Sequence, residues 1–147
     1  MTIAESLIKW LLEFNEDGRK MEKIDVDRQS AEVESYSLIK EPVINRTTNV
    51  LGEETLTAHY TLMARLADNT NTDRIENNAF GEAMEEWIEA KNDRREYPAI
   101  SKGKVLEVKV TTPFFVGRTE TNNSVYQMTV ALRYEKTKTA QEGENKQ

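Results

Sequence analysis

Hydrophobic and polar residues alternate along two long stretches of the chain. In the first stretch every second residue from Leu56 to Leu66 is apolar or aromatic, and in the second the same holds from Tyr126 to Tyr134. Side chains on a strand point alternately to its two faces, so each stretch predicts a strand with one core face and one solvent face. Antiparallel sheets covered on one side only show this alternation. The predicted solvent face of the first strand carries Thr57, His59, Thr61 and Arg65.

Two other stretches have the spacing of amphipathic helices. Near the N-terminus, Thr2 and Glu5 fit a capping box that opens a helix over about residues 3–14, which the polar residues up to Gly18 would end. The second helix runs to about residue 92, with Asp73 as its cap and Glu76 as the partner of that cap. Its apolar residues fall in the pairs Ala79/Phe80, Ala83/Met84 and Trp87/Ile88.

The remaining apolar residues predict shorter strands and two turns. Pro42 is expected to break one strand, and Pro113 is expected to end another, because proline cannot donate a backbone hydrogen bond to a sheet. Residues 51–54 are predicted to close a hairpin. The predicted strands comprise Ile24 and Val26, the segment around Tyr36 and Leu38, residues 44–50, and Leu106–Val110, with loops at 67–73 and 114–123.

This order of elements predicts one α+β domain over residues 1–135, with a mainly antiparallel sheet and two main helices packed on one face. The last residues, 136–147, contain no apolar periodicity and are predicted to form a flexible polar tail. A chain of 147 residues is long enough for one domain with a real core.

Composition narrows the classes of function. The chain has no cysteine, which excludes disulfides, thiolate metal sites and a cysteine nucleophile. Its formal net charge of -6 disfavours sequence-independent binding of nucleic acid, although DNA could still pass close by. No stretch approaches the roughly 20 apolar residues that span a bilayer. We therefore expect no membrane association.

The candidates for chemistry are weak. His59 is the one histidine, and no Ser or Asp accompanies it in a triad arrangement, so an ordinary strand residue is the simpler interpretation. Residues 69–73 resemble the opening of a calcium loop, but Arg74 replaces the required glycine and Phe80 the bidentate acid. Since no nucleophile, base and orienting partner can be assembled, we expect neither an enzyme nor a bound cofactor or metal.

Four acidic residues follow one side of the second predicted helix. Their spacing of i, i+3, i+4 and i+7 allows two interpretations: a solvated face, which is the usual role of a charge run, or an acidic surface that meets a basic partner or lines a channel for DNA. These residues are Glu82, Glu85, Glu86 and Glu89, called the acidic stripe below.

Two aromatic positions are candidates for a protein interface. Phe114 and Phe115 are adjacent and would point to opposite faces of a strand end, so one could cap the core while the other meets a partner. Arg118 and Glu120 follow in the same segment, and aromatic residues and Arg are common interface anchors. Trp10 lies beside the apolar stripe of the first helix, as a flank of the core or as a contact with a neighbour.

The chain resembles the minor capsid or tail-terminator proteins of tailed bacteriophages, especially phages of Gram-positive hosts. The resemblance covers about residues 3–135 and is weakest over residues 15–34. It lies in patterns of residues, not in a chemically specific motif. It is carried by the opening helix, the segment Ser35–Leu38, and residues 60–66, 82–92, 103–116 and 125–134.

The resemblance implies a structural virion protein that forms a ring, typically a hexamer, at the head-proximal end of the tail tube. Such a ring terminates tube polymerisation and joins the tail to the head connector or a head-completion protein. Its partners would be further copies of itself, the tail-tube protein, the connector and, in a contractile tail, the sheath. DNA would pass through the lumen without specific binding. The protein would be made in the host cytoplasm and reside at the head-tail junction of the virion.

Ring closure requires one patch of each protomer to meet a different patch of the next. The polar faces of the long strands, both loops and the tail 136–147 are candidates for these patches. Two alternatives remain open. One is another virion ring protein, such as a head-completion, tube or baseplate subunit, although no long hydrophobic insertion loop is evident for a tube subunit. The other is a non-virion acidic module that binds a protein.

Overall fold

The computed structural model describes residues 1–16 and 20–136. Five strands form one sheet in the order β1-β2-β3-β5-β4, in which only the short β1–β2 pair is parallel. The predicted α+β class with a mainly antiparallel sheet is therefore confirmed. The elements, in chain order, are α1 (Ile3–Leu11), β1 (Asp25–Val26), β2 (Ser35–Thr48), β3 (Glu54–Ala67), α2 (Asn71–Asp93), β4 (Gly103–Thr119) and β5 (Asn123–Lys136).

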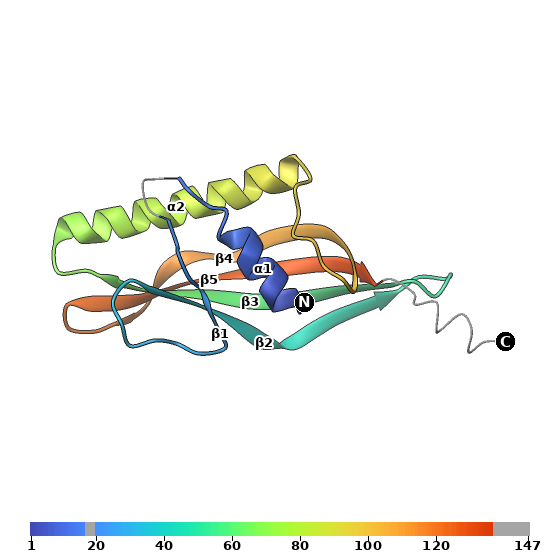
Figure 1. Cartoon of the computed structure of the whole chain (residues 1–147), viewed down its shortest axis with the longest axis horizontal. Helices are drawn as coiled ribbons and strands as arrows, with labels where there is room; N and C mark the ends of the chain where they lie inside the picture. Colours follow the sequence, from blue (N-terminus) through green and yellow to red (C-terminus); the bar gives the residue numbers. More distant parts are fainter. Residues whose placement is uncertain (17–19, 137–147) are drawn as a thin grey trace.

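Both helices pack on one face of the sheet, as predicted. Figure 1 shows α2 along the sheet from the end with the β4–β5 turn to about the middle, and α1 over the middle of the sheet. The same view shows that the β2–β3 turn lies at one end of this elongated molecule, whereas the β4–β5 turn and the start of α2 lie at the other. The two ends of the molecule therefore present different elements.

The core forms between the helices and the two central strands. Every apolar position of the two alternating stretches is buried, and the central strands pair through Tyr60 and Val130. From α2, Phe80, Met84 and Ile88 enter the same core at about full burial. The alternation in the sequence thus located both central strands and their core face correctly.

The N-terminal caps differ in how well the sequence located them. The capping box of Thr2 and Glu5 is present, and each backbone N–H lies 3.1 Å from the other side chain. The cap of α2 is Thr70, not Asp73 as predicted, and Asp73 is its partner in place of Glu76. In a capping box, a hydroxyl and a carboxylate three residues later each accept a hydrogen bond from the backbone N–H of the other residue. Thr70 and Asp73 form this box three residues earlier in the chain than the predicted pair Asp73 and Glu76.

The first helix is shorter than predicted. It ends at Leu11 and not at residue 14, and the N–H of Phe14 then bonds to the carbonyl of Leu11 at 3.1 Å. Phe14 is nevertheless fully buried. The turn after the helix still faces the core, which explains why the apolar periodicity of the sequence extends beyond the end of the helix. Lys136, predicted to begin the tail, is instead the last residue of β5. The expected end of the first helix at Gly18 and the rest of the predicted tail, 137–147, lie outside the described residues.

Neither proline ends a strand. β2 runs through Pro42 and β4 through Pro113, so the predicted break, the separate strand at 44–50 and most of the loop at 114–123 are wrong. Both strands lie near the edges of the sheet, and the pairing register shifts between Lys40 and Ile44 and between Thr112 and Phe115. A bulge on such a strand accommodates a residue without an N–H, which explains both errors.

The second face of the sheet is less open than the alternation suggested. Thr61 and Arg65 were predicted on a solvent face, yet they are 4% and 7% exposed. Thr61 donates to Glu41 of β2 at 2.5 Å, and Arg65 is covered by the chain around Ser30 and by the β4–β5 turn. Thr57 and His59 are half-buried beside them.

Candidate protein-interaction surfaces

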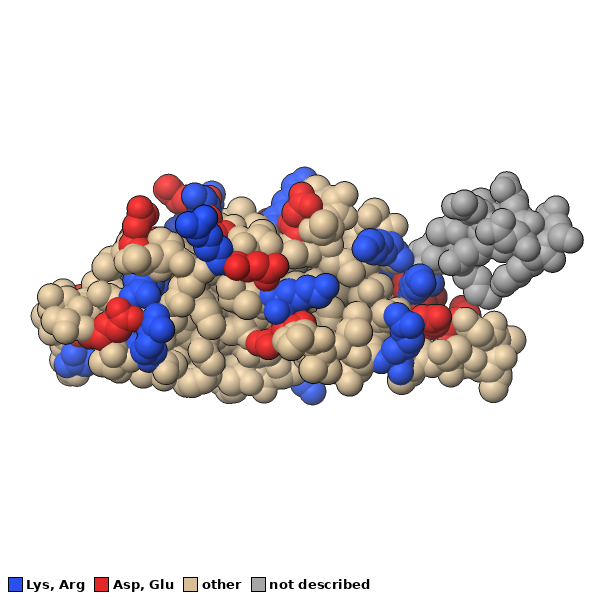
Figure 2. Space-filling model, turned by 90° about the horizontal axis from the view of Figure 1, so that it is seen from below, with Lys and Arg blue, Asp and Glu red and all other residues tan. Residues whose placement is uncertain are grey.

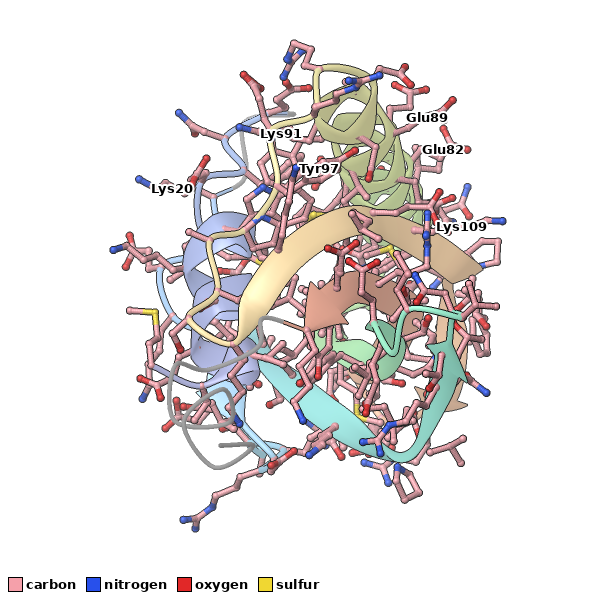
Figure 3. The ribbon with its side chains drawn as sticks, turned by 90° about the vertical axis from the view of Figure 1, so that its right-hand side faces the viewer. Lys20, Glu82, Glu89, Lys91, Tyr97 and Lys109 are labelled. Carbon is pink, nitrogen blue, oxygen red and sulfur yellow. The ribbon has the colours of Figure 1, made fainter. Side chains whose placement is uncertain are left out.

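The acidic stripe divides into one structural residue and three exposed ones. Glu85 is half-buried, and its carboxylate accepts a hydrogen bond from the backbone N–H of Phe114 at 3.2 Å. Glu82, Glu86 and Glu89 are exposed. Figure 3 shows Glu82 and Glu89 on the side of α2 that lies away from α1, with Lys109 of β4 below them.

A groove between α2 and β4 extends this acidic surface. Its volume is about 440 Å³, and Glu85, Glu89, Asp93 and Glu107 line it together with one cation, Lys109. The stripe therefore belongs to a larger surface with excess negative charge, formed by two elements distant in sequence. We call this surface the acidic groove.

Side chains of α2 also cover part of the edge of β4. Asn92 accepts from the N–H of Val108 at 2.8 Å and donates to the carbonyl of the same residue and to that of Ile88. Together with the bond from Phe114 to Glu85, these contacts satisfy backbone groups that an edge strand would otherwise offer to another chain. Open edge backbone is therefore to be sought beyond Phe114 on this strand.

The two adjacent phenylalanines have separate roles. Phe114 stacks on Tyr126 with ring centroids 5.2 Å apart and meets Phe80 edge-on at 5.8 Å, so it belongs to the core and not to an interface. Phe115 points to the opposite face, as predicted, and is 41% exposed. Val116, beside it, is 43% exposed. An interface role thus stays with Phe115 alone of the predicted pair.

Trp10 is a flank of the core and not a contact with a neighbour. It is 4% exposed, its ring lies 4.9 Å from that of Trp87 on α2, and its indole N–H donates to the carbonyl of Glu96 at 2.9 Å. Because the ring and the N–H are both satisfied within the chain, Trp10 does not serve as an interface anchor. Lys91 completes the site, with its ammonium 5.3 Å from the centre of the Trp87 ring.

Arg118 and Glu120 belong to an ionic network at the β4–β5 turn. Glu120 binds the guanidinium of Arg65 and that of Arg118, each at 2.9 Å. Asn123 accepts a second bond from Arg65 at 2.7 Å. The hydrogen bond from Arg65 is the main reason why the pKa of the Glu120 carboxyl lies below its usual range, and both positive charges add to it. This network compensates a buried guanidinium, so Glu120 has a structural role within the chain.

The hairpin of β2 and β3 carries four exposed apolar side chains that the sequence analysis did not propose as an interface. Val43 and Ile44 are 60% and 46% exposed along β2, and Val50 and Leu51 at the turn are 101% and 73% exposed. Figure 2 shows an uncharged surface at this end of the molecule. An apolar hairpin tip is therefore present, although the sequence analysis found no insertion loop. The clustering of Val43, Ile44, Val50 and Leu51 around one turn was the available signal.

A pocket at the base of the hairpin has a basic rim. It encloses about 480 Å³ between β2, β3, β5, Ile3 of α1 and the chain at Ser101. Its floor includes Tyr60 and Tyr134, and burial raises the pKa of both hydroxyls above the usual value. The charged residues that line it are all cationic: Lys40, Arg46, Lys102 and Lys136. We call it the basic-rimmed pocket.

The remaining sequence candidates have local explanations. The His59 ring contacts the amide oxygen of Asn45 at 2.8 Å on a neighbouring strand. Asn71 and Asp73, in the segment that resembled a calcium loop, lie inside α2. In the part of the chain that the structure describes, there is no group of three His, Cys, Asp or Glu residues that could hold a metal ion. Neither helix within the described ranges is long and apolar enough to cross a membrane.

Comparison with known proteins does not assign the chain to a family. A scan against models of protein families finds no match for the chain, and a search of curated proteins finds none either.

Proposed function

We propose that the chain is a structural virion protein of a tailed bacteriophage that forms a ring, a hexamer, at the head-proximal end of the tail tube. In this proposal the ring stops tube polymerisation and joins the tail to the head connector or a head-completion protein. Further copies of the chain and the tail-tube protein are its first partners, with the sheath added in a contractile tail.

The observation that carries the proposal is the presence of unlike surfaces at the two ends of one rigid sheet. One end of the molecule carries the hairpin turn with the exposed residues Val50 and Leu51. The exposed apolar residues Phe115 and Val116 lie on β4, which leads into the β4–β5 turn at the opposite end of the molecule. Ring closure needs a heterologous contact, in which one patch meets a different patch of the next copy. A protomer that presents unlike surfaces on its different sides has the arrangement that such a contact requires.

Unpaired strand edges support the same proposal. β1 pairs with β2 only at Ser37 and Leu38, so in the described chain the rest of the outer edge of β2 has no strand partner. On the other side of the sheet, β4 is the outermost strand, and α2 covers it only as far as Phe114. Exposed strand edges readily pair with another chain, so two free edges on opposite sides favour assembly.

Charge suits a channel for DNA. The chain has a net charge of -6. Tight phosphate binding depends on dense Lys and Arg, so this protein would hold DNA weakly and let it pass. Weak contact is an advantage for a ring through which a genome has to move.

The proposal is tested by negative-stain electron microscopy of tail-tube subunits from the same phage, polymerised with and without this protein. We expect tubes of limited length that carry a ring of this chain at one end. Tubes that grow to the same length without a cap would refute the function. The variant Val50→Asp/Leu51→Asp, which alters only exposed side chains at the hairpin tip, should fail to cap tubes. Val26→Asp/Val33→Asp, which alters two other exposed valines, is its matched control.

The hairpin also favours a second candidate, a subunit of the tube or baseplate. Subunits that stack need a projecting element to enter the neighbouring ring, and the apolar turn at Val50 and Leu51 is such an element. The same microscopy separates the two functions. A terminator caps tubes made of another protein, whereas a tube subunit polymerises by itself into long stacks of rings.

A further inference from the structure

The basic-rimmed pocket is an apolar hollow whose charges all have one sign. Ile44, Leu56 and Ala58 give it an apolar floor, and four cationic side chains surround that floor. Among the residues that line it in the described chain, none is acidic. A hollow of this kind favours an occupant that is itself acidic.

Little of this positive charge is neutralised from within the chain. Arg46 pairs with Glu54 at 3.3 Å, and Asp27 lies near Lys40 but accepts from its backbone N–H at 2.8 Å. Among the ion pairs of residues 1–16 and 20–136, none includes the ammonium groups of Lys40, Lys102 or Lys136. These three lysines are exposed and free to meet carboxylates of another molecule.

The chain carries a surface of the opposite charge. Glu82, Glu86 and Glu89 are exposed on α2, and the acidic groove continues them with Asp93 and Glu107. Lys109 is the one cation that lines this groove in the described chain. The acidic surface therefore has more carboxylates than the single lysine that lines it can neutralise.

The two surfaces lie on different sides of the molecule. Figure 3 shows Glu82 and Glu89 pointing from α2 away from α1, whereas Ile3 of α1 lines the basic-rimmed pocket. Surfaces placed in this way cannot meet within one copy, but they can meet between successive copies. A contact between unlike surfaces of identical chains is heterologous, as a ring requires.

From this placement we infer that the basic-rimmed pocket of one copy receives the acidic side of α2, residues Glu82–Glu89, from the next copy. This inference rests on the proposed function, because it names the contact by which the ring closes. Electrostatic complementarity of this kind sets the register and excludes wrong orientations, because like charges at an interface are costly. Salt weakens it, since the charges are exposed.

Charge reversal tests the contact. We compare Lys40→Glu/Lys102→Glu, the basic-reversed variant, with Glu86→Lys/Glu89→Lys, the acid-reversed variant, by sedimentation velocity at low and high salt. Each variant alone should associate about tenfold more weakly than the unaltered chain, because it brings like charges together. An equimolar mixture should recover association, since each reversed surface then finds an opposite one on the other variant.

Lys20→Glu/Lys23→Glu is the matched control, because it changes the net charge equally at exposed residues outside the pocket. It should associate like the unaltered chain. If both reversed variants associate as well as the control does, the contact is refuted. The inference also fails if neither the unaltered chain nor the mixture associates at any concentration or salt.

Cross-linking gives an independent measurement, because the chain has no cysteine of its own. Single-cysteine variants Lys102→Cys and Glu86→Cys are mixed with a short bismaleimide, which joins two thiols only when they are close. We expect more dimer from this mixture than from either variant alone or from Lys102→Cys with Lys20→Cys. Equal yields in all mixtures would contradict the contact.

The outcome is separable from that of the proposed function. If tubes remain uncapped but the charge-swapped mixture associates, the contact stands and the location in the virion is wrong. If rings cap the tubes and the reversed variants still form them, the function stands and the ring closes through another surface.

Discussion

Gly81 lies on the buried side of α2, directly against the ring of Phe114 on β4. A Cβ atom added at Gly81 would collide with three carbons of that side chain, and Phe114 is itself held by Tyr126 and Phe80. The absence of a side chain at this one position thus allows the helix to approach the edge strand closely. The pair links a residue in the middle of a helix to the strand segment that the sequence suggested as an interface.

Gly81→Ala should therefore destabilise the fold. Overpacking costs about 1–3 kcal/mol, and the better helix propensity of Ala returns about 1 kcal/mol of that. Urea unfolding followed by circular dichroism measures the net loss. Asn78→Ala, at an exposed position of the same helix, should be neutral or slightly stabilising. A gain of stability in Gly81→Ala would show that the ring of Phe114 does not pack there.

Glu120→Gln should destabilise the protein at pH 7, and progressively less as the pH falls below about 4.5. The pKa of this carboxyl is lowered in the folded state by the hydrogen bond from Arg65. A lowered pKa gives stability that is fully present above the unfolded value of about 4.5 and is lost as the pH falls through the folded value. Unfolding free energies of the variant and the unaltered chain should therefore differ at pH 7 and converge in acid. A difference that does not depend on pH would contradict this role.

At the scale of elements, the edge of β4 shows how a helix can protect a strand. Asn92 bonds both backbone groups of Val108, and Glu85 bonds the N–H of Phe114, so α2 takes the place of a further strand over this part of the edge. Beyond Phe114 this protection ends. The division between covered and uncovered edge is therefore fixed by two polar side chains of α2.

Asn92→Leu should expose the edge. The backbone N–H and carbonyl of Val108 would lose their partner, which costs about 1–3 kcal/mol for buried groups. Hydrogen exchange at the Val108 amide should accelerate, and the variant should aggregate more readily because an unpaired edge recruits other chains. Asn78→Leu on the exposed side of α2 is the control and should change neither measurement. Unchanged exchange at Val108 would mean that the strand edge is protected in another way.

The sequence predicted the elements whose signal is local and missed what depends on their arrangement. Alternation from Leu56 and from Tyr126 found the central strands because burial repeats there at every second residue. Pro42 and Pro113 misled the prediction, since proline ends a strand only where its N–H is needed. Thr61 and Arg65 were misplaced because their cover comes from distant segments. The basic-rimmed pocket combines five separate segments, so no single stretch of sequence predicts it.

At the scale of the whole molecule, the core and the surface proposed for assembly consist of different residues. The core lies between the helices and the central strands, whereas Val50 and Leu51 lie at the far tip of a hairpin and are exposed. Substitutions at the tip can therefore change assembly without changing the fold. This separation makes the proposed role accessible to mutation.

Val50→Asp/Leu51→Asp should leave the free energy of unfolding within about 0.5 kcal/mol of the unaltered chain, as exposed substitutions usually do. The capping of tubes, or the stacking of rings, should be lost because charge replaces an apolar contact. Thermal unfolding and electron microscopy of the same preparation measure the two effects. Val26→Asp/Val33→Asp alters two other exposed valines and should keep assembly. Tubes capped normally by the tip variant would exclude the hairpin from the contact.

The contact between Trp10 and Trp87 has an optical consequence. These are the two tryptophans of the chain, and their rings lie 4.9 Å apart between α1 and α2. Indoles at this distance couple electronically, so the tryptophan bands of near-ultraviolet dichroism and tryptophan emission should report chiefly the docking of one helix on the other. Far-ultraviolet dichroism is dominated by backbone structure. Recorded together during unfolding, the two spectra would reveal whether the helical layer detaches before the strands separate.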